Sequence, residues 1–172
     1  MTDESLLIKS ARRQDGKAFE ALYRIYAGEV YTLALRMIGD PHGAEDITQE
    51  IFVRLWQKIG TFRGRSSFRT WLYRLSMNVI IRQRSRIRNH REVSLYDPAL
   101  TDGEDMSSRV ALRLDLQRAV SSLPPRCRGV LVLHDLMGRT HPEIAEIMGI
   151  SPGTSKAHLH KARNLLRKEL KG

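Results

Sequence analysis

The sequence has a single cysteine, Cys127, among its 172 residues. One cysteine cannot form an internal disulfide, so the chain is not a small disulfide-stapled secreted domain. No apolar run approaches the roughly 18 residues of a membrane-spanning helix, and the first residues carry acids where a signal peptide has a basic segment. We therefore expect a protein of the reducing cytoplasm, without membrane insertion.

Strand patterns and catalytic motifs are also missing. No segment is rich in alternating valine and isoleucine, whereas apolar residues recur at helical spacing, as in Ile47, Ile51, Leu55 and Ile59. The histidines show no HExxH spacing, and the sequence has no G-x-x-x-x-G-K-[ST] phosphate loop. We predict an all-α fold class, and we expect no enzyme activity, metal or other cofactor. Cys127 is either a thiol whose pKa is lowered by the flanking Arg126 and Arg128 or, as we favour, a core residue.

Positive charge is concentrated in two blocks. The whole chain has 29 Lys and Arg against 19 Asp and Glu, and the excess lies in residues 51–92 and 125–172. Residues 93–108 between them contain proline, glycine and several acids without apolar periodicity, which predicts a flexible linker between domains 1–92 and 109–172. Basic runs are often solvated helix faces, but two separate blocks favour a polyanionic partner such as nucleic acid.

The C-terminal block has the local signals of a helix-turn-helix. Thr140 and Glu143 have the spacing of a capping box at the start of a short helix. Gly149 is suited to the left-handed position that ends this helix, and Ser151 followed by Pro152 starts the next. Two helices joined by a tight turn indicate a DNA-binding unit, although the same arrangement also occurs as a plain packing corner.

The second of these helices has two distinct faces. Helical spacing places Leu159, Ala162 and Leu166 on the inner face together with Ser155, where a valine substitution is expected to stabilise the domain. The residues predicted to point outward, toward DNA, are Lys156, Ala157, His160, Lys161 and Asn164, with Arg163 beside them. This mixture suits contacts with base edges and phosphates, while the alternative is an ordinary solvated basic helix.

The N-terminal block alternates aromatic residues with arginines over residues 62–78. Aromatic rings can stack on unpaired bases while guanidinium groups hold the backbone, which indicates single-strand binding. Phe62 and the loop from Gly64 to Ser67 are the favoured ligand-binding elements, whereas Trp71 is more consistent with core packing. Arg82, Arg84 and the arginines that follow extend the positive surface.

A neighbouring helix, residues 44–59, has an acidic face opposite its apolar stripe. Asp46, Gln49 and Glu50 lie on this face at helical spacing. They are suited to binding a basic protein partner, and a solvated face explains them equally well.

These segments together resemble the extracytoplasmic-function (ECF) group of bacterial RNA polymerase sigma factors. The resemblance runs from Leu6 to Leu170 and rests on AFEALYRIY, AEDITQEIFVRLW, FRTWLYRLSMN, the Leu123-Pro124 turn and HPEIAEIMGISPGTSKAHLHKARNLL. It implies that a region two docks on the clamp of the β′ subunit of core RNA polymerase and opens the minus-ten element of promoter DNA. A region four would bind the minus-thirty-five element, and the linker would cross the polymerase, including its β subunit.

The resemblance also assigns residues by position. It places Asp46, Gln49 and Glu50 at the polymerase contact, the residues Phe62, Arg63, Ser66, Ser67, Asn78 and Arg82 at the minus-ten element, and Lys156, Ala157, His160, Lys161 and Asn164 at the minus-thirty-five element. Arg65, Ser155 and His158 depart from the family's usual acid, valine and arginine. An anti-sigma factor is implied by the resemblance alone. The alternative function is a two-domain helix-turn-helix regulator that acts without replacing sigma.

Overall fold

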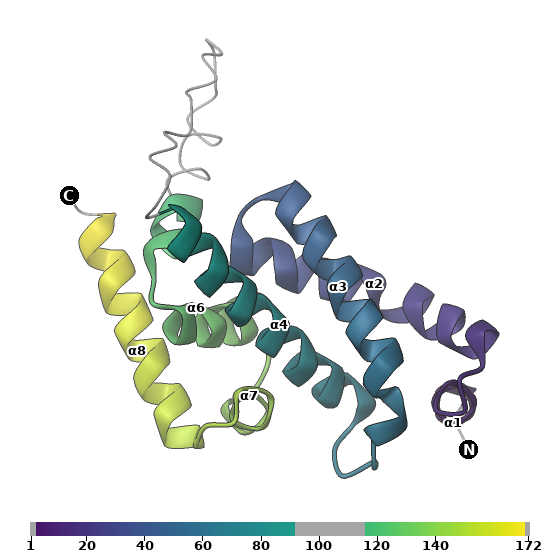
Figure 1. Ribbon diagram of the computed structural model, residues 1–172. Helices are drawn as coiled ribbons and strands as arrows, with labels where there is room; N and C mark the ends of the chain where they lie inside the picture. Colours follow the sequence, from purple (N-terminus) through teal and green to yellow (C-terminus); the bar gives the residue numbers. More distant parts are fainter. Residues whose placement is uncertain (1–2, 92–115, 171–172) are drawn as a thin grey trace.

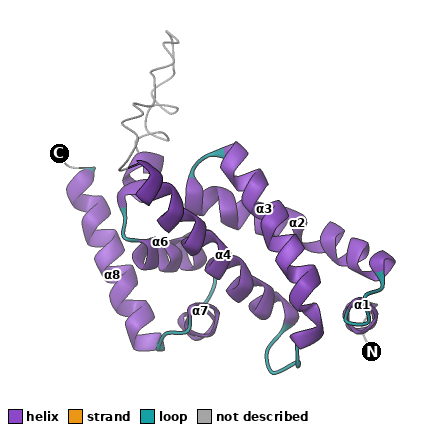
Figure 2. Cartoon of the chain, in the orientation of Figure 1, coloured by secondary structure: helices purple, strands orange, loops and turns teal. Residues whose placement is uncertain are grey.

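The computed structural model describes residues 3–91 and 116–170, without the side chains of residues 85–91. The described part consists of helices and loops without strands, as Figure 2 shows, and this confirms the all-α prediction. The predicted linker, residues 93–108, and the domain boundaries on either side of it lie outside the described residues. None of the described helices is both long and apolar enough to span a bilayer.

The N-terminal unit is built from the helices α1 (Asp3–Ala11), α2 (Gly16–Ile38), α3 (Pro41–Lys58) and α4 (Phe68–Arg91), with the short 3-10 turn η1 (Ile59–Thr61) after α3. The side chain of Asp15 caps α2 and that of Asp40 caps α3, because each accepts hydrogen bonds from first-turn backbone amides that have no acceptor within the helix. Gly39 ends α2 in the left-handed conformation, with φ of 81°. The predicted apolar stripe is confirmed, because its three residues on α3 and the fourth, Ile59 of η1, are all buried.

The C-terminal unit contains helical residues 116–122, α6 (Pro125–Leu131), the π-helical turn η2 (Val132–Leu136), α7 (His141–Met148) and α8 (Pro152–Glu169). The Thr140 and Glu143 capping box is present, and Gly149 ends α7 with φ of 65°. Ser151 caps α8 through the Thr154 amide, with Pro152 at the first helical position. The helix-turn-helix predicted from these residues is therefore confirmed in its local geometry.

The two units pack directly against each other, with α4 beside α7 (Figure 1). Gly129 of α6 lies so close to α4 that an added Cβ would come within 2.8 Å of the Met77 methyl carbon. Arg128 is buried between the units, donating from Nε to the Val120 carbonyl oxygen at 2.6 Å and from a terminal nitrogen to that of Met37 on α2. Burial, reinforced by the nearby Arg84 guanidinium, lowers the pKa of Arg128.

Candidate nucleic-acid interface

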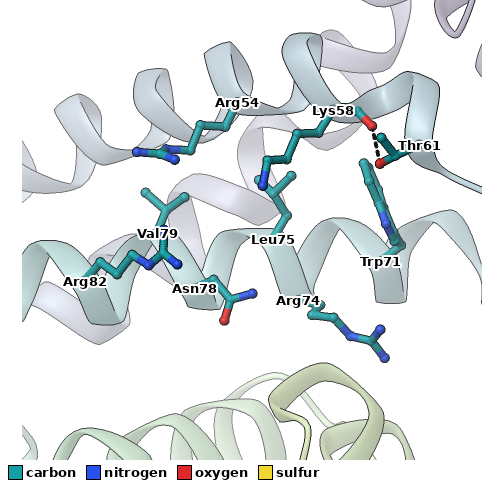
Figure 3. A pocket seen from close by; sticks show the side chains of 9 residues that line it. All are labelled: Arg54, Lys58, Thr61, Trp71, Arg74, Leu75, Asn78, Val79 and Arg82. Atoms are coloured by element: carbon teal, nitrogen blue, oxygen red, sulfur yellow. Dashed lines mark hydrogen bonds between the residues drawn. The ribbon is translucent and has the colours of Figure 1, made fainter.

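A basic cavity of about 240 Å³ lies between α3 and α4 (Figure 3). Two of its lining residues, Arg54 and Lys58, are one helical turn apart on α3. One lining residue is on the η1 turn, and the others follow one face of α4. The complete lining is Arg54, Lys58, Thr61, Trp71, Arg74, Leu75, Asn78, Val79 and Arg82. Cations, an aromatic ring and a side-chain amide thus surround one space, a combination suited to a phosphate and its attached base.

The cations that line this cavity are only partly neutralised. Arg54 pairs with Glu50 at 3.1 Å on its own helix. Arg74 donates two hydrogen bonds, of 2.9 and 2.6 Å, to the Glu146 carbonyl oxygen on α7. Lys58 and Arg82 have no side-chain partner among the described residues. Figure 3 shows Arg74 and Asn78 directed away from α3, toward the C-terminal unit.

Phe62 and Trp71 lie differently from the sequence-based expectation. The Phe62 ring is buried, with 8% of its surface exposed, and packs edge-on against Phe68 with ring centres 5.4 Å apart. Trp71 is half-buried and lines the basic cavity, 5.4 Å from Phe62. The expectation that Phe62 offers a free ring is therefore wrong for this conformation, because the ring completes an aromatic cluster. Trp71 contributes to both the core and the cavity.

The loop from Phe62 to α4 presents its cations to solvent. Arg63 and Arg65 are exposed, and Gly64 makes the turn between them with φ of 68°. Ser67 caps α4, because its hydroxyl oxygen accepts the Thr70 amide at 3.1 Å. Ser66 is half-buried beside it. A capping role for Ser67 was not foreseen from the sequence, although serine before a helical run is a recognisable signal.

The outward face of α8 agrees with the helical spacing. Ser155, Leu159 and Ala162 are buried and Leu166 is half-buried against the core, whereas Lys156, Ala157, His160 and Lys161 are exposed. Asn164 is half-buried, and its amide nitrogen lies 2.9 Å from His160 Nε2. The predicted candidates for DNA contact thus share one side of the helix.

Several polar contacts fix α8 to the rest of its unit. The Arg163 guanidinium donates to both carboxylate oxygens of Asp135, at 3.1 and 2.7 Å, and these hydrogen bonds lower the pKa of that carboxyl group. The buried Ser155 hydroxyl lies 2.9 Å from His141 Nδ1 on α7. His158 Nδ1 lies 3.5 Å from the Cys127 sulfur on α6. Two positions that depart from the family pattern are therefore each paired with a polar group.

Cys127 is a core residue with 2% of its surface exposed. Burial raises the pKa of its thiol, despite the opposing effect of the Lys161 charge. The favoured interpretation of this cysteine is confirmed, and the alternative of a thiol with a lowered pKa is wrong.

The acidic face of α3 is divided. Asp46 and Gln49 are exposed and have no side-chain partner in the described part of the chain. Glu50 is half-buried, and its carboxylate contacts Arg54 and accepts a hydrogen bond from Gln83 on α4. Asp46 and Gln49 are thus available to a partner protein, whereas Glu50 also joins α3 to α4.

Sequence reasoning missed two cavity cations, Arg54 and Lys58, and included Arg74 only as one of the arginines in the basic segment of residues 62–78. The spacing of Arg54 and Lys58 places both on one side of α3, and Arg74, Asn78 and Arg82 repeat the same interval on α4. Which sides of the two helices meet is decided by the packing of their buried faces. Within residues 3–91 and 116–170, no group of three or more histidine, cysteine or carboxylate side chains is arranged to hold a metal.

Both units match families of known proteins. Residues 22–91 match the family Sigma-70 region 2, and residues 113–166 match Sigma-70, region 4. The chain is 34% identical to the ECF RNA polymerase sigma factor SigW of Bacillus subtilis, with 95% of each chain covered. It is 35% identical to the ECF RNA polymerase sigma factor SigE of Mycolicibacterium smegmatis, covering 87% of this chain and 60% of that protein.

Solved structures share the fold. The sigma factor RpoE of Bartonella quintana, in complex with the anti-sigma factor NepR, aligns with a TM-score of 0.70 at 23% identity and covers 90% of this chain and 98% of its own. CnrH in complex with the cytosolic domain of CnrY aligns with a TM-score of 0.70 at 24% identity, covering 96% of each chain.

Proposed function

The chain belongs to the ECF group of RNA polymerase sigma factors, and we propose that its two helical units bind the two elements of a promoter through the surfaces described above. As a sigma factor it directs RNA polymerase to specific promoters for the initiation of transcription. The alternative of a regulator that acts without replacing sigma is not favoured, because both matched regions are sigma-70 regions.

The basic cavity between α3 and α4 binds the opened strand of the minus-ten element. The observation that carries this proposal is that Lys58, Arg82, Trp71 and Asn78 line one cavity. Cations bind the phosphates, the indole ring offers a stacking surface, and the amide can hydrogen-bond a base edge. Arg63, Ser66 and Ser67 form the adjoining loop, and Phe62 supports Trp71 from the core.

The outward face of α8 binds the minus-thirty-five element in the major groove. Lys156 and Lys161 attract phosphates, whereas His160 and Asn164 are short enough to contact base edges. Ala157 leaves room for close approach of the groove. The hydrogen bond between His160 and Asn164 fixes the relative orientation of these two polar groups.

The exposed side of α3 binds core RNA polymerase through Asp46 and Gln49, with Glu50 contributing from its edge. The acidic charge of this side suits a basic surface on the partner, which the resemblance identifies as the β′ clamp. The solved structure of RpoE contains the anti-sigma factor NepR, and that of CnrH contains the cytosolic domain of CnrY. We extend to this chain the existence of an anti-sigma factor as partner. The cytoplasm, which contains core polymerase, is the proposed site of action.

The proposal is tested by reconstituting the chain with core RNA polymerase and transcribing a library of randomised promoters. We expect transcripts from templates that share two sequence elements. The variant K58A/R82A removes the two unpaired cations of the cavity and should lower the yield of opened promoter about tenfold, as measured by permanganate reactivity of unpaired thymines, with closed complexes retained.

The matched control is R24A/R36A, which removes two exposed charges from α2, on the same unit. It should open promoters as well as the wild type does. Equal promoter opening by K58A/R82A would overturn the assignment of the cavity, and failure of the wild-type chain to associate with core polymerase would overturn the whole proposal.

A further inference from the structure

The turn between α1 and α2 is fixed against the end of α3. Gln14 adopts a left-handed backbone conformation with φ of 66°, which is costly for a residue other than glycine. Its side-chain amide donates to the Trp56 carbonyl oxygen at 3.4 Å. The Arg12 carbonyl oxygen lies 3.9 Å from the position of a Cβ built on Gly60 in η1. The turn is therefore close to Gly60, which lies two residues before Phe62, where the basic loop begins.

This turn carries cations that nothing in the described chain neutralises. Arg12 and Arg13 are both exposed, and neither side chain has a partner among the described residues. The nearby Asp15 carboxylate is engaged in capping α2 through the amides of Lys17 and Ala18. Figure 1 draws α1 at the same end of the molecule as the loop between α3 and α4. Arg63 and Arg65 of that loop extend the same kind of exposed, unpaired charge.

The order of the cationic groups along the molecule indicates which ligand the α1–α2 turn binds. The positive face of α4 runs from Arg82 through the cavity toward its N-terminal end, and the loop that precedes α4 joins the end of α3, where the turn is fixed. Duplex DNA held near Arg82 and opened at the cavity would leave as a single strand on the side of the loop. A strand that continued in this direction would reach the α1–α2 turn, which contacts the end of α3 and η1.

We propose that Arg12 and Arg13 form an additional single-strand site, which binds phosphates of the opened strand immediately downstream of the minus-ten element. The proposal rests on the proposed function of the cavity. The contact is with the DNA backbone and is independent of base sequence, because two exposed guanidinium groups without a fixed acceptor bind phosphate charge and do not distinguish bases. For single-stranded DNA, two phosphate contacts contribute about 1.4 to the slope of log affinity against log salt concentration.

The test uses the full chain bound to core polymerase and a forked promoter fragment selected in the transcription experiment. One fragment ends its single strand at the minus-ten element, and a second extends it by about six nucleotides. We expect the wild type to bind the extended fork more tightly. The variant R12A/R13A should lose this gain, with a salt slope on the extended fork lower by about 1.4, and should bind the short fork like the wild type.

R24A/R36A is again the control, since it removes the same number of charges from exposed positions of α2, and it should keep the full gain from the extension. An equal gain in R12A/R13A and the wild type would overturn the proposal. So would a lower affinity of R12A/R13A for core polymerase in the absence of DNA, because the surface would then bind protein. If the wild type binds neither fork, the function proposed for the cavity falls as well, which distinguishes the two failures.

Discussion

Ser155 shows how a single position departs from a simple inward-facing pattern. Its side chain is fully buried, as its place on α8 predicts, but its hydroxyl contacts His141 Nδ1 at 2.9 Å. The expectation that valine would stabilise this position considered only apolar burial. It omitted the polar partner, whose position depends on how α7 packs on α8.

Ser155→Ala should therefore lower the free energy of unfolding by about 1 kcal/mol, the usual net value of one intramolecular hydrogen bond. Ser155→Val should give no net stabilisation, because the added methyl groups are offset by the loss of the same bond. Chemical denaturation of the full chain measures both changes. A valine variant clearly more stable than the wild type would show that the hydrogen bond contributes little.

Substitution of the side chains of Asp46 and Gln49 tests the proposed contact with core polymerase. Because both are exposed and lack partners in the described chain, D46A/Q49A should weaken binding to core polymerase about tenfold and leave the melting temperature unchanged. Glu50→Ala is expected to weaken binding and also to lower the melting temperature, since it breaks contacts with Arg54 and Gln83. Fluorescence titration with core polymerase, beside thermal melting, separates the two effects. Unchanged affinity in D46A/Q49A would exclude this face.

At the scale of elements, two substitutions on α8 should separate attraction of phosphate charge from selection of base sequence. Lys161→Ala should weaken binding to all minus-thirty-five variants about equally and reduce the salt slope by roughly one unit. His160→Ala should instead change the ranking of variants, by about 1 to 3 kcal/mol at one base position. Titrations of a base-substituted promoter panel at several salt concentrations measure both. An unchanged ranking in His160→Ala would show that another side of α8 enters the groove.

The start of α7 makes the stability of the C-terminal unit depend on pH. Burial, together with the charges of His134, Lys156 and Arg163, lowers the pKa of His141 below its ordinary value of 6.5. The folded chain then binds fewer protons here than the unfolded chain does. The contribution of His141 is complete above about pH 6.5 and is lost as the pH falls through its lowered folded-state pKa.

We expect the melting temperature to fall between pH 7.5 and pH 5.5, and to fall less steeply in His141→Gln, which has no group to titrate. Thermal melting across this range measures the difference between the two slopes. Identical slopes would show that His141 takes no part in the pH dependence.

The helix ends and buried stripes were the most predictable features of this chain. The caps at Thr140, Gly149 and Ser151 depend on residues a few positions apart, so the sequence contains the whole interaction. The cavity was only half predicted, because Asn78 and Arg82 lie on it but Arg54 and Lys58 come from another helix. Phe62 was misjudged for the same reason, since its burial depends on Phe68 and Trp71 packing over it.

At the scale of the whole molecule, the two units hold each other through groups that no local pattern reveals. Arg128 gives no sequence signal of burial, yet it joins α6 to a carbonyl oxygen of α2. Arg74 belongs to the basic cavity and also binds α7. An arginine in a basic block is expected to be solvated, and only the docking of two separately predicted units turns it into a structural link.

This packing conflicts with simultaneous binding of both promoter elements. Elements centred about 25 base pairs apart are separated by roughly 85 Å of duplex, at 3.4 Å per base pair. In this structure α4 and α7 are in contact. If the chain binds both elements of one promoter as proposed, its two units must separate, which releases Arg74 from the Glu146 carbonyl oxygen.

The distance between the two units shows whether one chain binds both promoter elements at once. Fluorophores attached to H42C on α3 and L116C in the C-terminal unit occupy exposed positions close to the contact between Gln117 and Gly39, while Cys127 is buried. We predict efficient energy transfer between them in the free chain and a large loss of transfer in the open complex with core polymerase and promoter. Energy transfer that stays high in a transcribing complex would show that one chain does not bind the two elements at once.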